Sequence, residues 1–330
     1  MPGPATGCGK ERVGARMDPL LVIEHLSKRF GPIVAVDEVS FTLRRGEVLG
    51  FLGPNGAGKS TTMRMITGYL APSSGRVTVC GLDLARAPIE VRRRIGYLPE
   101  GAPAYGDMTP LGLLEFVAAL RGYANAARRE RIDAMIDLLE LKSVVHQPIE
   151  TLSKGFKRRL GLATALLHDP EVLILDEPTD GLDPNQKHHV RTLLQDMAKD
   201  KAIIISTHIL EEVDAVCTRA IVIARGRVVI DAKPAELEAR SSYHNAVALR
   251  LPADHLERAQ AVVAGVPGVV RVEDGRAATG VAELIAFPAK DAEILDPVCR
   301  AIEDAGLAVN EVFVERGRLD EVFRELTRAA

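Results

Sequence analysis

The chain has 330 residues, enough for two domains with a sizeable buried core in at least one of them. Hydrophobic residues make up 47% of it and charged residues 26%, which is ordinary for a soluble globular protein. A net charge of −3, the lack of tryptophan and 4% aromatic residues argue against a nucleic-acid partner, which needs basic charge and stacking rings.

The cysteines, the apolar runs and the N-terminal residues argue against several further classes of protein. The chain has four cysteines, Cys8, Cys80, Cys217 and Cys299. They form no C-x-x-C pair, which favours free thiols over a disulfide framework or a zinc site. No apolar run approaches the roughly 18–20 residues that cross a bilayer, and residues 1–16 lack the apolar stretch of a secretory signal. We expect a disordered extension over 1–18, with Met17 as an alternative start.

The first predicted elements are strands. Residues 20–24 and 39–43 run apolar or alternate at strand length, with Phe30-Gly31-Pro32 turning between them, which indicates a small antiparallel sheet. A buried strand over 47–52 follows. It leads directly into the ten residues Gly53-Pro54-Asn55-Gly56-Ala57-Gly58-Lys59-Ser60-Thr61-Thr62.

These ten residues fit G-x-x-x-x-G-K-[ST], the phosphate-binding P-loop. Glycine lets the backbone turn so tightly that successive N–H groups face an anion, and the helix expected over 60–67 directs its positive N-terminus to the same place. In this motif Lys59 reaches the β- and γ-phosphates and the Ser60 hydroxyl ligates Mg²⁺. A strand before the loop and a helix after it argue against a chance match.

Further strands and two amphipathic helices follow. The strands are predicted at 75–81, 95–99, 172–176, 202–206 and 220–224. Thr109 is expected to cap a helix with Pro110 in its first turn, and apolar residues then recur at helical spacing from Leu113; a second helix shows the same period from Ile132. Continuous apolar strands separated by helices indicate a parallel sheet covered on both faces.

The strand over 172–176 ends in two carboxylates, Asp176 and Glu177, as in the second motif of P-loop nucleotidases (Walker B). Asp176 would hold Mg²⁺ directly or through water, and Glu177 would polarise the attacking water. Two acids at a strand end can also be solvated loop charges. The P-loop upstream favours the catalytic interpretation.

Between these motifs lies Leu152-Ser153-Lys154-Gly155-Phe156-Lys157-Arg158-Arg159, in which Ser153 can cap a basic helix. This stretch is similar to the LSGGQ signature of ABC-transporter ATPases. Other family elements match in order. Phe30 corresponds to an aromatic residue that stacks on adenine, Asp180-Gly181-Leu182-Asp183 to the D-loop, and His208 to the switch histidine that contacts the γ-phosphate.

The resemblance covers about residues 20–235 and, more weakly, a C-terminal segment over 319–327. That segment looks like the end of ATPases serving drug, antibiotic, polysaccharide and gliding-motility exporters. Three departures from the family pattern resemble the same branch: Lys154 and Phe156 in the signature, and Glu100 where most of the family has the Q-loop glutamine. The family position would place Glu100 near Mg²⁺ and the γ-phosphate.

The resemblance implies an ATP-hydrolysing subunit of an ABC exporter with ATP and Mg²⁺ as cofactors. The implied catalytic residues are Lys59, Glu177 and His208. The implied nucleotide-binding residues are Phe30, Gly53, Pro54, Asn55, Gly56, Ala57, Gly58, Lys59, Ser60, Thr61, Ser153, Gly155 and Asp183, and the metal ligands are Ser60, Asp176 and Glu100. Ser153 and Gly155 of one copy would close on the nucleotide of the other in a head-to-tail homodimer.

The resemblance also implies a separately encoded membrane-spanning permease and a peripheral place on the cytoplasmic side of the membrane. The alternative is a soluble ABC ATPase that acts on ribosomes or nucleic acid. Translation-type members resemble two fused cassettes and repair-type members carry long coiled coils, and this sequence has neither feature. A nucleotide-binding regulator that does not hydrolyse is disfavoured by Glu177 and His208.

The expected fold is an α/β P-loop NTPase core over 19–240, with an antiparallel β subdomain and a helical subdomain over about 101–165. From about Tyr243 the pattern changes to βαββαβ, closed by a short helix over 319–326. This order predicts a small ferredoxin-like α+β domain over 241–330. Its role, regulation or dimerisation, is left open by the sequence.

Overall fold

The computed structural model describes residues 18–275, 280–289 and 292–329. The expected N-terminal extension therefore lies outside the described residues except for Asp18, and so do Met17 and Cys8. Two compact units divide between Asp231 and Ala232, and each is described by itself. Within the described residues, no helix combines the length and apolar character that crossing a membrane requires.

The first unit contains an antiparallel sheet. It is formed by β1 (Leu21–Phe30), β2 (Ile33–Leu43), β4 (Ser74–Val79) and β5 (Leu82–Asp83), in the order β2-β1-β4-β5. β1 pairs antiparallel with both β2 and β4. The predicted pairing of the first two strands is thus confirmed, and the predicted strand over 75–81 joins the same sheet. Leu21, Ile23 and Leu26 of β1 are buried in a core shared with the helix α1 (Lys59–Ile66).

The second sheet of this unit has six strands in the order β10-β9-β3-β8-β7-β6. They are β3 (Val48–Leu52), β6 (Ile95–Leu98), β7 (Val172–Asp176), β8 (Ala202–Thr207), β9 (Arg219–Ala224) and β10 (Arg227–Ala232). The strands from β9 to β6 pair in parallel. Their residues are almost all buried, as continuous apolar strands predict.

The strand register sets where the loops meet. Leu52 of β3 lies opposite Thr207 of β8, and Asp176 of β7 lies opposite Ser206 of β8. Because the strands are parallel and end level with one another, the segments that follow β3, β7 and β8 emerge at one edge of the sheet. That edge carries the predicted site.

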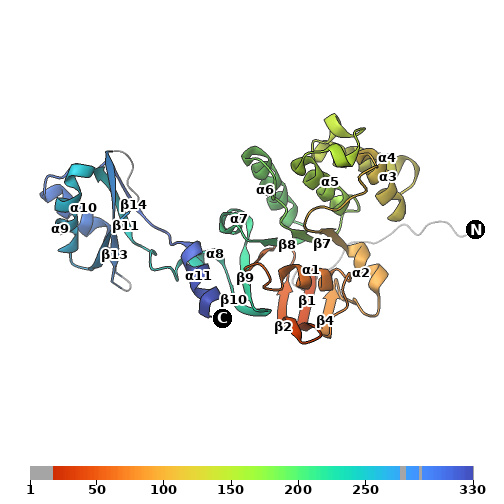
Figure 1. Ribbon diagram of the computed structural model, residues 1–330, viewed down its shortest axis with the longest axis horizontal. Helices are drawn as coiled ribbons and strands as arrows, with labels where there is room; N and C mark the ends of the chain where they lie inside the picture. Colours follow the sequence, from red (N-terminus) through yellow and green to blue (C-terminus); the bar gives the residue numbers. More distant parts are fainter. Residues whose placement is uncertain (1–17, 276–279, 290–291, 330) are drawn as a thin grey trace, which may run out of the picture. The chain divides into compact units, whose positions relative to one another are not determined.

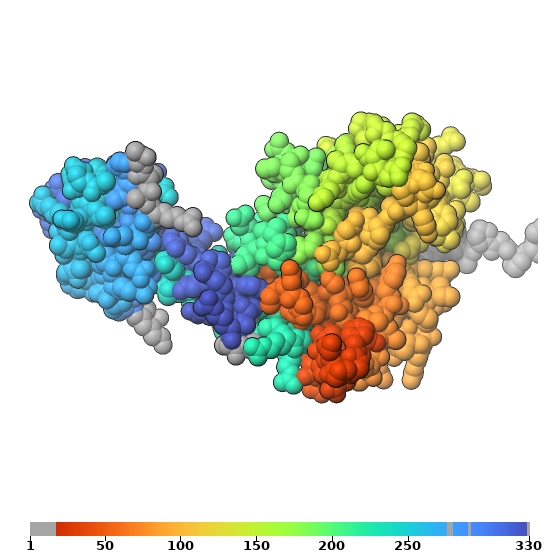
Figure 2. Space-filling model, in the orientation of Figure 1, coloured from red at the N-terminus to blue at the C-terminus, as the bar shows by residue number. Residues whose placement is uncertain are grey.

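Helices complete the first unit. They are α1 (Lys59–Ile66), α2 (Pro88–Arg94), α3 (Pro110–Leu120), α4 (Asn125–Leu138), α5 (Lys154–Leu166), α6 (Pro184–Ala198) and α7 (Leu210–Val216), with short 3-10 turns η1 (Lys142–Val144) and η2 (Ile149–Thr151). Helices α3, α4 and α5 contact one another and form the expected helical block (Figure 1). In the space-filling view, the antiparallel sheet (red and orange) and this block (yellow to light green) occupy different parts of the unit's surface (Figure 2).

The second unit has its own sheet and core. In chain order it contains α8 (Pro234–Glu238), β11 (Val247–Pro252), η3 (Ala253–His255), α9 (Leu256–Ala264), β12 (Val269–Asp274), β13 (Val281–Pro288), α10 (Leu295–Asp304), β14 (Glu311–Val314) and α11 (Leu319–Ala329). The sheet order is β12-β13-β11-β14, and the neighbouring strands are antiparallel. Leu249, Leu284 and Val298 belong to its main core. This arrangement has the predicted βαββαβ order.

The division between the units falls earlier in the chain than the expected boundary at residues 240 and 241. Residues 232–240 group with the second unit because α8 contacts α11. Ser241 and Ser242 then donate hydrogen bonds from their hydroxyls to Glu321 of α11. Such long-range packing is not visible in the local sequence pattern.

Candidate active site

The P-loop joins β3 to α1 and is held closely by two neighbouring segments. A Cβ on Gly53 would lie 2.4 Å from the carbonyl oxygen of Ile223, and one on Gly58 would lie 2.5 Å from that of Ala35. Gly58 also has φ +106°, a conformation that side chains disfavour. Both positions therefore require glycine, which keeps the loop in contact with β2 and β9.

The outer part of this loop is open and its lysine is folded back. Pro54, Asn55 and Gly56 are exposed, whereas Ala57, Gly58 and Lys59 are buried; Ser60 and Thr61 in the first turn of α1 are half-buried. The Nζ atom of Lys59 donates to the carbonyl oxygens of Gly53, at 2.6 Å, and Pro54, at 3.3 Å. The ammonium group is thus positioned inside the curve of the loop.

Burial lowers the pKa of Lys59, while the negative charges of Glu177, Asp176 and Glu100 act in the opposite direction. Three predicted site carboxylates therefore act electrostatically on the P-loop lysine. Two of them follow each other at the end of β7, and Glu100 is exposed just after β6, the strand next to β7.

Asp176 and Glu177 have different surroundings. The buried Asp176 carboxylate accepts a hydrogen bond from the Ser206 hydroxyl. Glu177 has φ +52°, a left-handed conformation uncommon for a residue other than glycine, and its N–H donates to the Ser206 carbonyl at 3.0 Å. Backbone strain of this kind gathers at functional sites.

The carboxylate of Glu177 is joined to His208, the residue directly after β8. His208 Nδ1 lies 2.8 Å from Glu177 Oε1, and the imidazole is 61% exposed. Burial raises the pKa of Glu177, and the hydrogen bond to His208 opposes that change. Lys59, Glu177 and His208, the predicted catalytic residues, thus lie at the same edge of the parallel sheet.

The predicted signature and D-loop residues lie at helix starts. Ser153 caps α5 by accepting from the Phe156 N–H at 3.3 Å, as predicted. Asp183 caps α6 by accepting from the Gln186 N–H at 2.9 Å. The two starts touch, because a Cβ on Gly155 would lie 2.8 Å from Oε1 of Gln186.

Phe30 is located at the end of β1, on the hairpin that leads into β2. Its ring is about half exposed, and the Lys28 ammonium lies 5.2 Å from the ring centroid. The same β2 strand touches Gly58 of the P-loop through Ala35.

Arg158 of α5 is a site residue that the sequence interpretation missed. Its buried guanidinium donates to the carbonyl oxygens of Pro99, at 3.2 Å, and Asp176, at 3.3 Å. Nη2 lies 3.8 Å from Oδ2 of Asp180. Arg158 thus ties the signature helix to the segments containing Glu100, Asp176 and the D-loop; within a basic run its burial could not be recognised.

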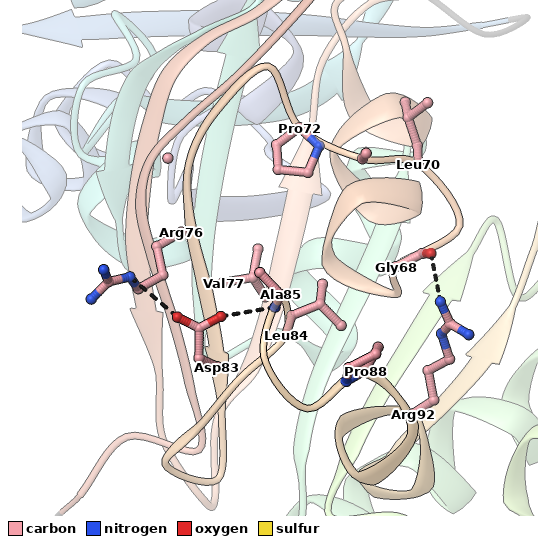
Figure 3. A pocket seen from close by; sticks show the side chains of 12 residues that line it. Gly68, Leu70, Pro72, Arg76, Val77, Asp83, Leu84, Ala85, Pro88 and Arg92 are labelled. Atoms are coloured by element: carbon pink, nitrogen blue, oxygen red, sulfur yellow. Dashed lines mark hydrogen bonds and ion pairs between the residues drawn. The ribbon is translucent and has the colours of Figure 1, made fainter.

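A separate pocket of about 460 Å³ lies between β4, β5 and α2 (Figure 3). Leu70, Val77 and Leu84 line it, and Arg76 is paired with Asp83 at 3.4 Å on its wall. The guanidinium of Arg92 donates to the Gly68 carbonyl at 3.1 Å. None of the predicted site residues lines this pocket, so it is distinct from the predicted nucleotide site.

Comparison with known proteins identifies the family. The profile described as "ABC transporter" matches residues 36–180. The chain is 36% identical over 233 residues to the probable multidrug ABC transporter ATP-binding protein YbhF of Escherichia coli, covering 69% of this chain but only 40% of that protein's length. It is 37% identical to the Nod factor export ATP-binding protein I of Ralstonia nicotianae, covering 72% of this chain and 71% of that protein.

A third relative extends the similarity into the second unit. The daunorubicin resistance ATP-binding protein DrrA3 of Streptomyces coeruleorubidus is 33% identical, covering 94% of this chain and 96% of the relative. Among solved structures, the dimeric structure of MJ0796, a bacterial ABC transporter cassette, superposes with a TM-score of 0.59 at 25% identity, covering 65% of this chain and 98% of that one. The predicted fold class is confirmed, and the chain belongs to the ATP-binding proteins of the ABC transporter family.

Proposed function

We propose that this chain binds ATP with Mg²⁺, hydrolyses it, and thereby powers an ABC exporter whose membrane-spanning permease is a separate protein. The observation that carries the proposal is the position of Lys59, Asp176, Glu177 and His208 at one edge of the parallel sheet. The names of the relatives, which include a multidrug transporter protein and a Nod factor export protein, support export as the direction.

The oxygen donors at this edge fit Mg²⁺. The Ser60 hydroxyl and the carboxylates of Asp176 and Glu100 are hard oxygen ligands, which Mg²⁺ prefers. Among the residues that the structure describes, no three His, Cys, Asp or Glu side chains form a dedicated metal cluster. That suits Mg²⁺, which usually takes one or two carboxylates together with phosphate oxygens and water. When bound, the ion neutralises charge that develops on the phosphates.

The P-loop would hold the phosphates. Its exposed turn, residues 54–56, offers backbone N–H groups to an anion, and the N-terminus of α1 adds its positive end. Lys59 Nζ donates to two loop carbonyls. With ATP bound it would donate to phosphate oxygens instead, and their negative charge would compensate for the burial of the ammonium group. Residues 53–61 would thus bind the triphosphate, with Phe30 stacking on adenine.

Glu177 would orient the attacking water and accept its proton. A carboxylate is needed for both, and the hydrogen bond from His208 holds it in one orientation. Asp176, fixed by the Ser206 hydroxyl, would hold the metal rather than the water. The exposed face of His208 would contact the γ-phosphate.

A second copy would complete the site. Ser153 is exposed at the start of α5, two residues before Gly155, which lies against Leu182 of the D-loop. In a head-to-tail dimer, Ser153 and Gly155 would close on the γ-phosphate held by the partner copy. The solved MJ0796 cassette is a dimer, which supports this arrangement.

An apolar patch on the first unit suits a permease. Tyr69 is 77% exposed and Leu120 is 71% exposed, beside a pocket of about 300 Å³ that Tyr97 and Val117 also line. Exposed apolar groups gathered at one place mark interaction sites. We propose that a cytoplasmic segment of the permease docks here, which would hold the chain at the cytoplasmic side of the membrane as a peripheral protein.

ATP hydrolysis by the purified chain tests the proposal. Replacing Lys59 with Ala removes the cation from the phosphates, so Mg²⁺-dependent hydrolysis should fall by about 100-fold or more. Lys199→Ala, which changes an exposed lysine at the end of α6, should leave the rate unchanged. Wild-type turnover in Lys59→Ala would exclude the P-loop as the nucleotide site.

A further inference from the structure

A buried carboxylate links the two loops that carry Glu177 and His208. Glu212 in the first turn of α7 is 3% exposed. It accepts a hydrogen bond from the Thr179 hydroxyl on one carboxylate oxygen and, at 2.9 Å, from the Thr207 hydroxyl on the other. Both threonines are buried as well, with 3% and 0% exposure.

The Thr207 hydroxyl fixes the backbone on both sides of His208. Thr207 immediately precedes His208, and its hydroxyl oxygen accepts from the N–H of Ile209, the residue after it, at 3.0 Å. The same hydroxyl donates to Glu212. The turn carrying His208 is therefore anchored to α7 through one side chain.

The Thr179 hydroxyl anchors the other loop. Thr179 is two residues after Glu177, and its carbonyl accepts from the Leu182 N–H at 3.2 Å, while the Asp180 N–H donates to the Glu177 carbonyl at 3.2 Å. Thr179 thus belongs to the turn between Glu177 and the D-loop. Its bond to Glu212 fixes that turn relative to the His208 turn.

The chemistry of the link favours a carboxylate. Within the described residues, Glu212 forms no ion pair with a lysine, arginine or histidine, and the Thr179 and Thr207 hydroxyls donate to its buried carboxyl oxygens. A buried carboxylate is costly unless donors compensate it, and an apolar residue in its place would leave both buried hydroxyls without an acceptor. Two carboxylate oxygens accept one hydroxyl each, whereas an amide has one oxygen and an NH₂ group that cannot accept.

We propose that Glu212 is a positioning residue for hydrolysis, which fixes the Thr179 turn against the Thr207 turn and so holds His208 within hydrogen-bonding distance of Glu177. It acts through those turns and touches neither nucleotide nor water. The inference rests on the proposed function, in which Glu177 orients the attacking water.

Replacing Glu212 with Gln tests the inference. Because misplacing a catalytic group by a fraction of an ångström is costly, kcat should fall at least about tenfold. The KM for ATP and the affinity for a nonhydrolysable ATP analogue should stay at wild-type values, since the P-loop follows a different strand. Glu211→Gln is the matched control, because Glu211 is the exposed neighbour on the same helix. Equal kcat values for the two variants would overturn the proposal.

A pair of threonine variants covers the case in which Glu212→Gln does not fold. Thr179→Ser keeps the hydroxyl and should retain most of the wild-type kcat, whereas Thr179→Val keeps the shape, loses the donor and should lower kcat at unchanged KM. Thermal unfolding confirms that both are folded. Equal kcat for the two, or a loss of ATP affinity in step with kcat, would contradict positioning.

The wild-type rate separates failure of the proposed function from failure of this inference. If the wild-type chain hydrolyses no ATP, the proposed function fails and the inference falls with it. If the wild type is active and the variants are unaffected, the inference alone is overturned.

Discussion

Nδ1 of His208 and Oε1 of Glu177 lie 2.8 Å apart, although the two residues follow different strands of the parallel sheet. The pairing of β7 with β8 brings them together, since Asp176 lies opposite Ser206. The left-handed backbone of Glu177 accompanies this contact. The imidazole therefore holds the carboxylate at the place where the proposed reaction needs it.

Loss of the His208 imidazole should slow hydrolysis with little effect on ATP binding. In His208→Ala the Glu177 carboxylate loses its hydrogen-bonding partner and can rotate, so kcat should fall about 100-fold. The KM for ATP should change by less than about threefold, because the P-loop, which would make most of the phosphate contacts, is unchanged in this variant. The matched control is His188→Ala, which changes an exposed histidine of α6. Steady-state kinetics on both variants gives the comparison, and a His208→Ala rate equal to that of the control would contradict this role.

Glu100 should set the Mg²⁺ dependence of the reaction. Its carboxylate adds a charge that repels phosphate unless the metal is present, whereas an amide offers an oxygen without that charge. Glu100→Gln should therefore retain hydrolysis but depend less on Mg²⁺, and Glu100→Ala should impair coupling to transport more than nucleotide binding. ATPase rates measured across a Mg²⁺ titration decide this, with Glu115→Gln, an exposed acid on α3, as the control. Superimposable curves for all four proteins would make Glu100 an ordinary surface acid.

The second unit should be dispensable for nucleotide binding. The predicted nucleotide residues of one copy all precede Asp231, and residues 232–329 have a separate core. A chain ending at Asp231 should therefore fold and bind ATP with an affinity within about threefold of the full chain. Circular dichroism establishes folding and calorimetric titration measures binding, with Lys59→Ala in the same shortened chain as the negative control. If the shortened chain folds but binds no ATP, the first unit needs the second unit for nucleotide binding.

Much of the site could be predicted from the sequence because its determinants are local. The P-loop needs glycine at fixed spacing, apolar runs give the strands on either side of it, and capping residues such as Thr109 and Ser153 act within one turn of their helices. Because the carboxyl ends of parallel strands meet at one edge of the sheet, the predicted strands alone place Asp176 and His208 at the same edge.

The remaining features depend on contacts distant in the sequence. Arg158 and Glu212 look like ordinary charges on amphipathic helices, and only the packed structure shows that both are buried and join separate loops. The early start of the second unit likewise depends on α8 contacting α11. Local sequence patterns carry no signal for contacts between distant helices, which is why the domain boundary expected from the sequence, at residues 240 and 241, lies later in the chain.

The most direct test of the proposed function is the molar mass of Glu177→Gln with ATP and Mg²⁺, measured by light scattering after size-exclusion chromatography. The amide keeps the shape of the side chain but cannot take the proton of water, so turnover should fall by about 100- to 1,000-fold and ATP should accumulate between two copies. We predict a dimer that requires ATP and that disappears when Lys59→Ala is added to the same chain. A protein that remains a monomer with ATP and still hydrolyses it at the wild-type rate would contradict the account.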